Sequence, residues 1–392
     1  MRTASILGAA LLLAPAAALV SPLGRASPRA RPAPLRATAV VPADWGLTPV
    51  VPIVSAEILG RDAGSCDPYD PNSDEYCSPA AEVSDTQRTL KLTALFTLWY
   101  ILNVGYNICN KTVLNVLPIP WTAATLELFF GLPYLGFLWL TRLRKTPKLS
   151  ASNIKVLLPS AFFLAATHVG GVISFGAGAI SFTHVIKATE PVWSALLSAV
   201  FFREFLKIPV YLSLVPIIGG VIVASLKEVS FTWVSFTAAL LSAVFSAAKA
   251  ILSKKVLDGK PLGENLTPAN MFGVLTILGC FIITPFSLAI EPPKAIAAAW
   301  SAALAAGHTQ LELYRLLFAS GFLYYIYNEV AFLALSEVAP VTHAVTNTVK
   351  RVVIILVSVA VFKTPITGVG AAGSGVAILG ACLYALAKGK YK

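Results

Sequence analysis

Four basic side chains lie in segments that are otherwise almost wholly apolar: Lys187, Lys249, Lys350 and Arg351. A charge at the centre of a membrane-spanning helix costs at least about 2.5–3.5 kcal/mol, so such residues are functional candidates by default. Arginine can fork two hydrogen bonds to a phosphate, and lysine presents a compact charge. A phosphomonoester carries about −1.5 to −2 charges near neutral pH. The cluster therefore predicts a site for a mobile, doubly charged anion.

The spacing of polar residues around these cations predicts two lined helix faces. Thr183, Lys187 and Glu190 stand at i, i+4 and i+7, on one face of a helix. A second face at i, i+4, i+7 and i+8 consists of His343, Asn347, Lys350 and Arg351. We expect both faces to line one cavity.

Other interpretations of these cations remain open. Lys249 could extend to a membrane interface, and Lys187 could simply pair with Glu190. The Lys350-Arg351 pair could lie in a loop, although apolar sequence continues after it. No Cys, His and acid grouping has metal-ligand spacing, and no nucleophile–base motif or glycine-rich phosphate loop is recognisable. The sequence therefore predicts no metal, no cofactor and no enzyme.

The chain that contains these charges is unusually apolar. Of the 392 residues, 56% are hydrophobic and 12% are charged, against about a quarter charged in soluble domains. This composition excludes a soluble enzyme, a disordered chain and a nucleic-acid-binding protein, despite the net charge of +11. Ten segments have spanning length: 92–110, 121–141, 155–175, 179–202, 208–226, 231–252, 270–290, 313–335, 339–362 and 366–387. Residues 295–306 are too few to span and predict an interfacial helix.

Two internal matches predict an all-α membrane protein built from inverted repeats. NICNKTVLN at 107–115 resembles AILSKKVLD at 250–258. A second match joins Thr183-His184, Pro209 and Gly219-Gly220 to Thr342-His343, Pro365 and Gly375. Each match links a segment to the fifth one after it, and an odd number of crossings reverses orientation. We therefore expect ten transmembrane helices in two inverted five-helix repeats, 89–228 and 229–392, as in secondary transporters.

The N-terminal region has the composition of a targeting leader. Residues 1–20 have the form of a signal peptide, and residues 21–40 contain Arg, Ser and Pro with no acid, as transit peptides do. This bipartite order resembles the leaders of algae whose plastid came from a eukaryotic endosymbiont. Residues 41–88 carry nine acids and two Arg and predict an acidic disordered tail. Within it Cys66 and Cys77 are either idle thiols or a redox-sensitive clip.

Loop charges predict the orientation in the membrane. With ten spans, fifteen Lys and Arg residues fall on the side of the two termini and five on the other side. This excess follows the positive-inside rule. We therefore expect both termini on the positive side of the membrane.

Several stretches resemble the plastid phosphate translocators of the drug/metabolite transporter superfamily. They are LWYILNVGYNICNK at 98–111, SFTHVIKATEP at 181–191, YLSLVPIIGG at 211–220, SKKVL at 253–257, YIYNE at 325–329 and APVTHAVTNTVKRVVII at 339–355. The resemblance covers roughly residues 90–390. It implies ten helices in two inverted repeats and exchange of phosphate for triose phosphate, 3-phosphoglycerate, phosphoenolpyruvate, pentose phosphate or hexose phosphate. The membrane implied is the inner plastid envelope, with the termini in the stroma.

The resemblance also implies roles for individual residues. Lys187, Lys350 and Arg351 match the residues that hold the phosphate, Tyr327 matches a substrate contact, and His168 matches a residue that reaches the carbon moiety in several subfamilies. By residue type alone, His168 is more often a satisfied structural residue than a ligand. The candidate cavity-lining residues are Thr183, Glu190, Ser246, Lys249, His343 and Asn347.

Departures from the family pattern leave the substrate class open. Gly171 provides no hydroxyl three residues after His168, and Ser246 and Lys249 replace an aromatic residue and an arginine, so a smaller wall could admit a larger sugar phosphate. His168 argues mildly against the phosphoenolpyruvate class.

The resulting expectation is an antiporter that exchanges phosphate for a phosphorylated C3, C5 or C6 metabolite, with triose phosphate or 3-phosphoglycerate first. Its partners are the lipid bilayer and phosphorylated small molecules, not nucleic acid; the sequence predicts no oligomeric state. One alternative is a nucleotide-sugar or other sugar-phosphate carrier of the secretory pathway. An alternative of another class is a membrane-embedded phosphotransferase or hydrolase.

Overall fold

The computed structural model describes residues 85–391, except residues 227, 259–261, 337 and 339. The predicted signal peptide, the transit-like segment and residues 41–84 with Cys66 and Cys77 lie outside the described residues. The prediction of a disordered tail up to residue 88 is wrong at its end, because a helix begins at Asp85. From residue 91 onward the described chain forms one compact unit.

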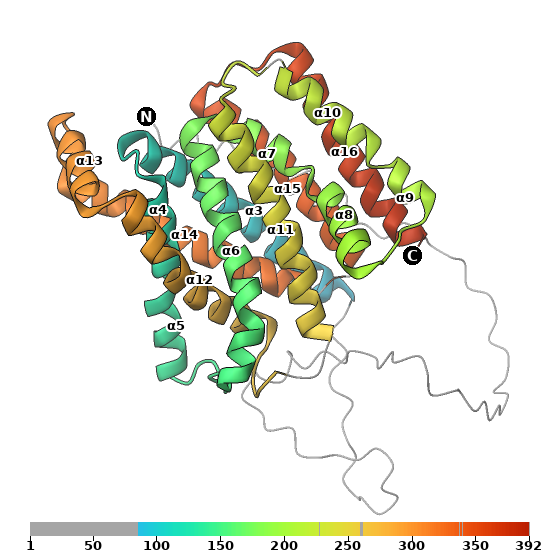
Figure 1. Ribbon diagram of the computed structural model, residues 1–392, viewed down its shortest axis with the longest axis horizontal. Coiled ribbons are helices and arrows are strands. Elements are labelled where there is room, and N and C mark those ends of the chain that lie inside the picture. The colour runs from blue at the N-terminus through green and yellow to red at the C-terminus, as the bar shows by residue number, and fades with distance from the viewer. Residues whose placement is uncertain (1–84, 227, 259–261, 337, 339, 392) are drawn as a thin grey trace, which may run out of the picture. The chain divides into compact units, whose positions relative to one another are not determined.

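Regular structure in the described chain is helical apart from one isolated backbone bridge. The helices are α3 (Asp85–Val116), α4 (Pro120–Phe129), α5 (Gly131–Leu140), α6 (Ala151–Ala177), α7 (Ile180–Lys187), α8 (Glu190–Phe202), α9 (Ile208–Leu212), α10 (Val215–Leu226), α11 (Trp233–Asp258), α12 (Pro268–Ile290), α13 (Pro293–Ala305), α14 (Gln310–Ser336), α15 (Pro340–Phe362) and α16 (Gly368–Lys390). This confirms the predicted all-α class (Figure 1).

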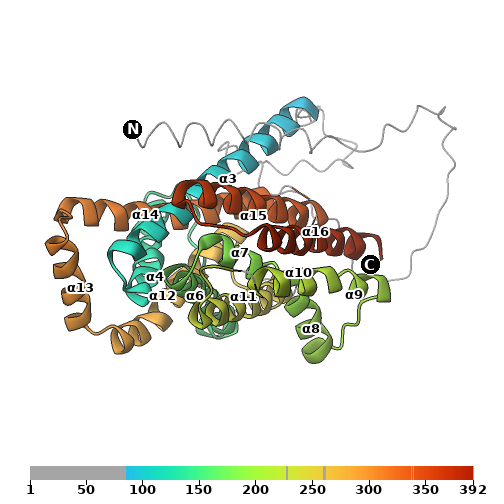
Figure 2. The ribbon, with the colours of Figure 1, turned by 90° about the horizontal axis from the view of Figure 1, so that it is seen from above.

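Nine stretches of the described helices are long and apolar enough to cross a bilayer. Two of them, Pro120–Leu140 and Ile208–Leu226, contain a short break between successive helices. The tenth predicted segment, 179–202, is divided into α7 and α8, and neither reaches spanning length by itself. The count of ten crossings therefore stays a prediction. The short segment expected at 295–306 is the 13-residue helix α13, which lies at the edge of the bundle in Figures 1 and 2.

Proline explains where the three interrupted segments break. A proline inside a helix clashes with the carbonyl of the residue four positions earlier and offers no N–H to it. Pro133, Pro191 and Pro216 lie four residues after Phe129, Lys187 and Leu212, which are the last residues of α4, α7 and α9. At Pro191 the predicted segment 179–202 is therefore completely interrupted, between the end of α7 and the start of α8. It places Lys187 at a helix end rather than within a continuous span.

Two pairs of helices run side by side along much of their length (Figure 1). One pair is α6 with α11, and the other is α10 with α16. In the second pair the backbones approach closely at Gly220 and Gly373. A Cβ on Gly220 would lie 2.6 Å from the carbonyl oxygen of Gly373, nearer than real Cβ contacts. Small residues permit this backbone approach, as in other membrane helix pairs.

Two loops meet at the isolated bridge between Lys148 and Glu264. The N–H of Lys148 donates to the carbonyl of Glu264 at 3.0 Å, and the side chains form an ion pair at 2.7 Å. The hydrogen bond with Glu264 raises the pKa of Lys148, and the same bond lowers the pKa of Glu264. Both side chains are exposed, so the ion pair contributes little stability. The bridge nevertheless places the loop after α5 against the loop after α11.

Candidate anion-binding site

Lys187 ends α7 and lies between α6 and α11. A cation at the C-terminal end of a helix is favoured by the helix dipole. Its Nζ donates to Ser242 Oγ of α11 at 3.0 Å, and Ser242 Oγ donates to the carbonyl of Thr167 on α6 at 2.6 Å. A Cβ on Gly171 of α6 would lie 3.5 Å from Nζ. The glycine that the sequence analysis noted as a departure therefore lies directly beside the lysine ammonium.

Arg351 pairs with Glu190, which joins α15 to α8. Nη2 of Arg351 donates to Oε2 of Glu190 at 2.7 Å, and Ser246 Oγ of α11 donates to Oε1 at 2.7 Å. The other guanidinium nitrogen, Nη1, is buried and has no hydrogen-bond partner. The carboxylate therefore satisfies one side of Arg351 and leaves the other side available. The proposed pairing of Glu190 with Lys187 is wrong, because Glu190 pairs with Arg351.

Lys350 is held against α3. Its Nζ lies 4.5 Å from the centre of the Trp99 ring, a cation–π distance. Lys350 and Arg351 are both interior residues of α15, Pro340–Phe362, which excludes the interpretation that they form a loop pair. Lys187 lies close enough to both for their positive charges to repel one another. The structure thus brings Lys187, Lys350 and Arg351 together from α7 and α15, and Lys249 of α11 lies near enough to repel the two lysines as well.

The remaining candidate lining residues have mixed outcomes. Ser246 contacts Glu190. Lys249 lies one turn further along α11, and Asn347 lies one turn before Lys350. The side chains of Lys249 and Asn347 are half-buried. Thr183 is fully buried, and its Oγ1 hydrogen bonds with Ser174 Oγ at 2.6 Å. It therefore packs α7 on α6, and the expectation that it lines a cavity is wrong. The side chain of His343 lies outside the described part of the chain.

His168 lies one turn before Gly171 on α6 and faces a carboxylate that the sequence analysis missed. Its Nε2 lies 3.0 Å from Oε2 of Glu127 on α4. Glu127 is 2% exposed. It accepts hydrogen bonds from Tyr106 at 3.1 Å, Asn110 at 2.6 Å and Ser320. We call these five residues the Glu127 cluster; they come from α3, α4, α6 and α14.

Tyr327, the predicted substrate contact, lies next to this cluster. Its ring centre lies 5.1 Å from that of Tyr106, whose hydroxyl contacts Glu127. The ring of Tyr324, one turn earlier on α14, lies 4.0 Å from the His168 ring. Unlike Glu127 and His168, the Tyr327 side chain is only half-buried. The predicted substrate contact Tyr327 and the residue expected at the carbon moiety, His168, are thus neighbours of one carboxylate.

Glu127 and Ser242 are the functional candidates that sequence reasoning missed. A signal for Glu127 was available, since it is an acid within the apolar segment 121–141, and acids inside membrane segments are functional candidates. Ser242 gave no signal, because serine is tolerated on any helix face. Only the packing of α11 on α6 places its hydroxyl beside Lys187.

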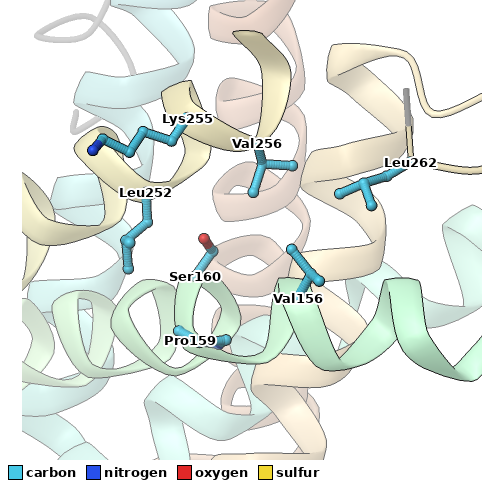
Figure 3. Close-up of a pocket in the computed structure, with 7 residues that line it drawn as sticks. All are labelled: Val156, Pro159, Ser160, Leu252, Lys255, Val256 and Leu262. Carbon is cyan, nitrogen blue, oxygen red and sulfur yellow. The ribbon is translucent and has the colours of Figure 1, made fainter. Parts of the chain in front are cut away.

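A separate groove of about 390 Å³ lies between α6 and α11 near the end of the bundle that carries the Lys148–Glu264 bridge (Figure 3). It is lined by Val156, Pro159, Ser160, Leu252, Lys255, Val256 and Leu262. The wall is mainly apolar, and none of the site residues above belongs to it. It is therefore distinct from the cationic cluster.

The family model that describes the Triose-phosphate Transporter family matches residues 90–385. This range contains Lys187, Lys350 and Arg351 and every residue of the Glu127 cluster.

Curated relatives match over most of the chain. A phosphoenolpyruvate/phosphate translocator of Oryza sativa is 38% identical over 79% of this chain and 74% of its own length. A glucose-6-phosphate/phosphate translocator of Arabidopsis thaliana is 37% identical over 78% of each. A triose phosphate/phosphate translocator of Brassica oleracea is 36% identical over 77% of this chain and 74% of its own length. Relatives with different named substrates thus have nearly equal identity.

Proposed function

Because the chain belongs to the triose-phosphate transporter family, we propose that it exchanges inorganic phosphate for a phosphorylated C3, C5 or C6 metabolite across a plastid envelope membrane. Triose phosphate and 3-phosphoglycerate are the first organic substrates to test. The relatives named above are chloroplastic phosphate translocators, which supports both the activity and the compartment. The proposed membrane is the inner envelope of a secondary plastid, with both termini in the stroma.

The observation that carries this proposal is the half-satisfied guanidinium of Arg351. Its Nη1 is buried without a partner, while Lys187 and Lys350 are held by a hydroxyl and an aromatic ring rather than by carboxylates. A phosphate dianion has oxygens that can accept from the guanidinium and from both ammonium groups. We therefore assign Lys187, Lys350 and Arg351 to the phosphate.

The same charges explain why transport should be an exchange. Alternating access requires a state in which both gates are closed, and in that state the cations lose contact with water. Removing an unpaired ion from water costs several kcal/mol. A bound dianion offsets the charge and lets the site close, whereas an empty site stays open to one side. Exchange should therefore be much faster than net flux.

Reconstitution in liposomes tests this proposal. Vesicles are loaded either with phosphate or with an inert salt, and entry of labelled phosphate is followed with unlabelled triose, pentose, hexose and enol phosphates competing outside. We expect rapid uptake only into phosphate-loaded vesicles. Equal uptake into both kinds of vesicle contradicts exchange, and no uptake by folded protein contradicts the assignment to phosphate.

A further inference from the structure

The Glu127 cluster is not among the side chains assigned to the phosphate, and it surrounds one buried carboxylate with hydrogen-bond donors. Three groups donate to Glu127, and the His168 ring lies 3.0 Å from it. A carboxylate that only accepts hydrogen bonds matches such a ring of donors. Within a membrane protein, this arrangement holds a negative charge at a fixed place.

The cluster lies close, along α6, to the lysine that is assigned to the phosphate. Lys187, which is assigned to the phosphate, lies beside Gly171, and His168 lies three residues, about 4.5 Å of helix rise, earlier on the same helix. Tyr327, half-buried, stacks on Tyr106, whose hydroxyl contacts Glu127. A metabolite with three or more carbons that runs from the cations past His168 therefore approaches Glu127.

On this basis we propose that Glu127 determines substrate specificity by favouring phosphorylated metabolites with an uncharged hydroxyl or carbonyl tail over those with a carboxylate tail. The inference rests on the proposed phosphate exchange. A carboxylate tail would bring a second negative charge close to Glu127 in surroundings of low effective dielectric, where like charges repel strongly. Hydroxyl groups carry no such penalty and can exchange hydrogen bonds with His168 and the surrounding donors. Specificity of this kind acts by rejection of the wrong substrate.

The distribution of charged side chains in the site supports a preference for uncharged tails. The cations gather at the end formed by α7 and α15, where the phosphate is assigned. At the other end, the described groups within contact distance of Glu127 are neutral donors and one histidine, and no Lys or Arg is among them. A second cation at that end would favour a carboxylate tail, whereas the side chain found there is the carboxylate of Glu127.

The test compares two three-carbon phosphates that differ mainly in the tail. Dihydroxyacetone phosphate and 3-phosphoglycerate compete against labelled phosphate in phosphate-loaded liposomes containing the full chain. We expect 3-phosphoglycerate to compete at least about tenfold more weakly in the wild type. In Glu127→Gln, which removes the charge and keeps the shape, we expect this ratio to fall by about fivefold or more while phosphate–phosphate exchange persists. Glu291→Gln is the matched control, because that carboxylate contacts the N-terminus of the same helix, α4, at Trp121 and Thr122.

The outcomes separate the two proposals. If the wild type shows no phosphate–phosphate exchange, the proposed function itself is overturned. Intact exchange with equal competition by the two metabolites in the wild type overturns the specificity assignment, and this result requires no variant to fold. A wild-type preference that Glu127→Gln leaves unchanged also overturns it, because the preference then comes from other residues. Phosphate–phosphate exchange in each variant shows that the protein is folded.

Discussion

At the scale of single residues, the site is defined by which charges the protein satisfies and which it leaves for a substrate. Arg351 has one nitrogen on Glu190 and one without a partner, and Lys350 rests on the face of Trp99. Neither arrangement cancels the charge completely. The proposed anion site is therefore already ordered in this structure, which lowers the cost of ordering it when an anion binds.

Removal of either cation of α15 should stop exchange. Hydrogen bonds to charged groups contribute about 1.5–3 kcal/mol, so we expect Lys350→Ala or Arg351→Ala to lower exchange by at least about tenfold. Thermal stability should change little in Lys350→Ala, whereas Arg351→Ala should lower it because Glu190 loses its ion-pair partner. Exchange by purified variants in liposomes measures the effect, and Lys294→Ala on the exposed surface of α13 is the control. Near-normal exchange in a folded variant contradicts the assignment.

Glu190 should act as a competitor of the substrate. Its carboxylate occupies Arg351 in this structure, as one side of a phosphate would. Glu190→Gln should lower the KM for phosphate by about threefold to tenfold, an effect of roughly 0.7–1.4 kcal/mol. Because phosphate is bound more tightly in this variant, its release should slow, and the maximal exchange rate should also fall.

Exchange at several phosphate concentrations separates these two effects. Ser246→Ala is the matched variant, because it removes only the serine hydrogen bond to Glu190 and leaves the Arg351–Glu190 pair in place. An increased KM in Glu190→Gln would show that the carboxylate supports phosphate binding instead.

The sequence predicted the cations of this site but not their partners. A charged residue in an apolar segment can be recognised from the sequence alone, so Lys187, Lys350 and Arg351 are predicted as candidate site residues. Spacing along one helix also suggested that Lys187 meets Glu190, whereas packing places Glu190 on Arg351 of another helix. A contact between helices depends on how they pack, and short spacings within one segment carry no information about it.

At the scale of helices, proline divides three predicted spans. Pro133, Pro191 and Pro216 each follow a helix end by four residues, but Pro159 and Pro285 lie inside α6 and α12 without ending them. The local rule is the same in all five cases. The sequence therefore predicted the positions of the segments well and could not predict which proline interrupts one. For α7, the break matters functionally because it leaves Lys187 at a helix end.

Close packing of α10 on α16 should depend on the absence of side chains at particular glycines. A Cβ on Gly220 or Gly373 would collide with backbone of the partner helix, whereas nothing lies within 4 Å of a Cβ on Gly219 or Gly375. Overpacking costs about 1–3 kcal/mol. We expect Gly220→Val and Gly373→Val to lower the Tm of the purified protein clearly. Gly219→Val and Gly375→Val should have much smaller effects, and equal losses at all four glycines would contradict this packing.

At the scale of the whole molecule, two loop contacts support ten crossings. The Lys148–Glu264 bridge joins the loop after the second predicted span to the loop after the sixth. Glu291 contacts the N-terminus of α4, which joins the loops after the first and seventh spans. Loops in contact lie on the same side of a membrane, and both contacts require an even number of spans between them. That condition is met only if α7 and α8 together count as one crossing.

Labelling of single cysteines tests this count. In a chain without its natural cysteines, Pro147→Cys and Asn265→Cys should react with an impermeant reagent from one side of a sealed vesicle. Gly307→Cys should react from the opposite side only. If α7 and α8 do not cross, Pro147 and Asn265 lie on opposite sides. Exchange by each labelled variant is the control for correct folding.

The loop between α5 and α6 is tied to distant parts of the chain at two points. Arg144 forms an ion pair with Glu329 of α14, and Lys148 bridges to Glu264. Any conformational cycle that opens this face of the transporter must stretch or release these ties. A fluorophore and a quencher attached to the two bridged loops would therefore brighten and dim with each turnover. The fold thus contains an attachment point for an optical sensor of transport, in loops that hold none of the residues proposed to bind the substrate.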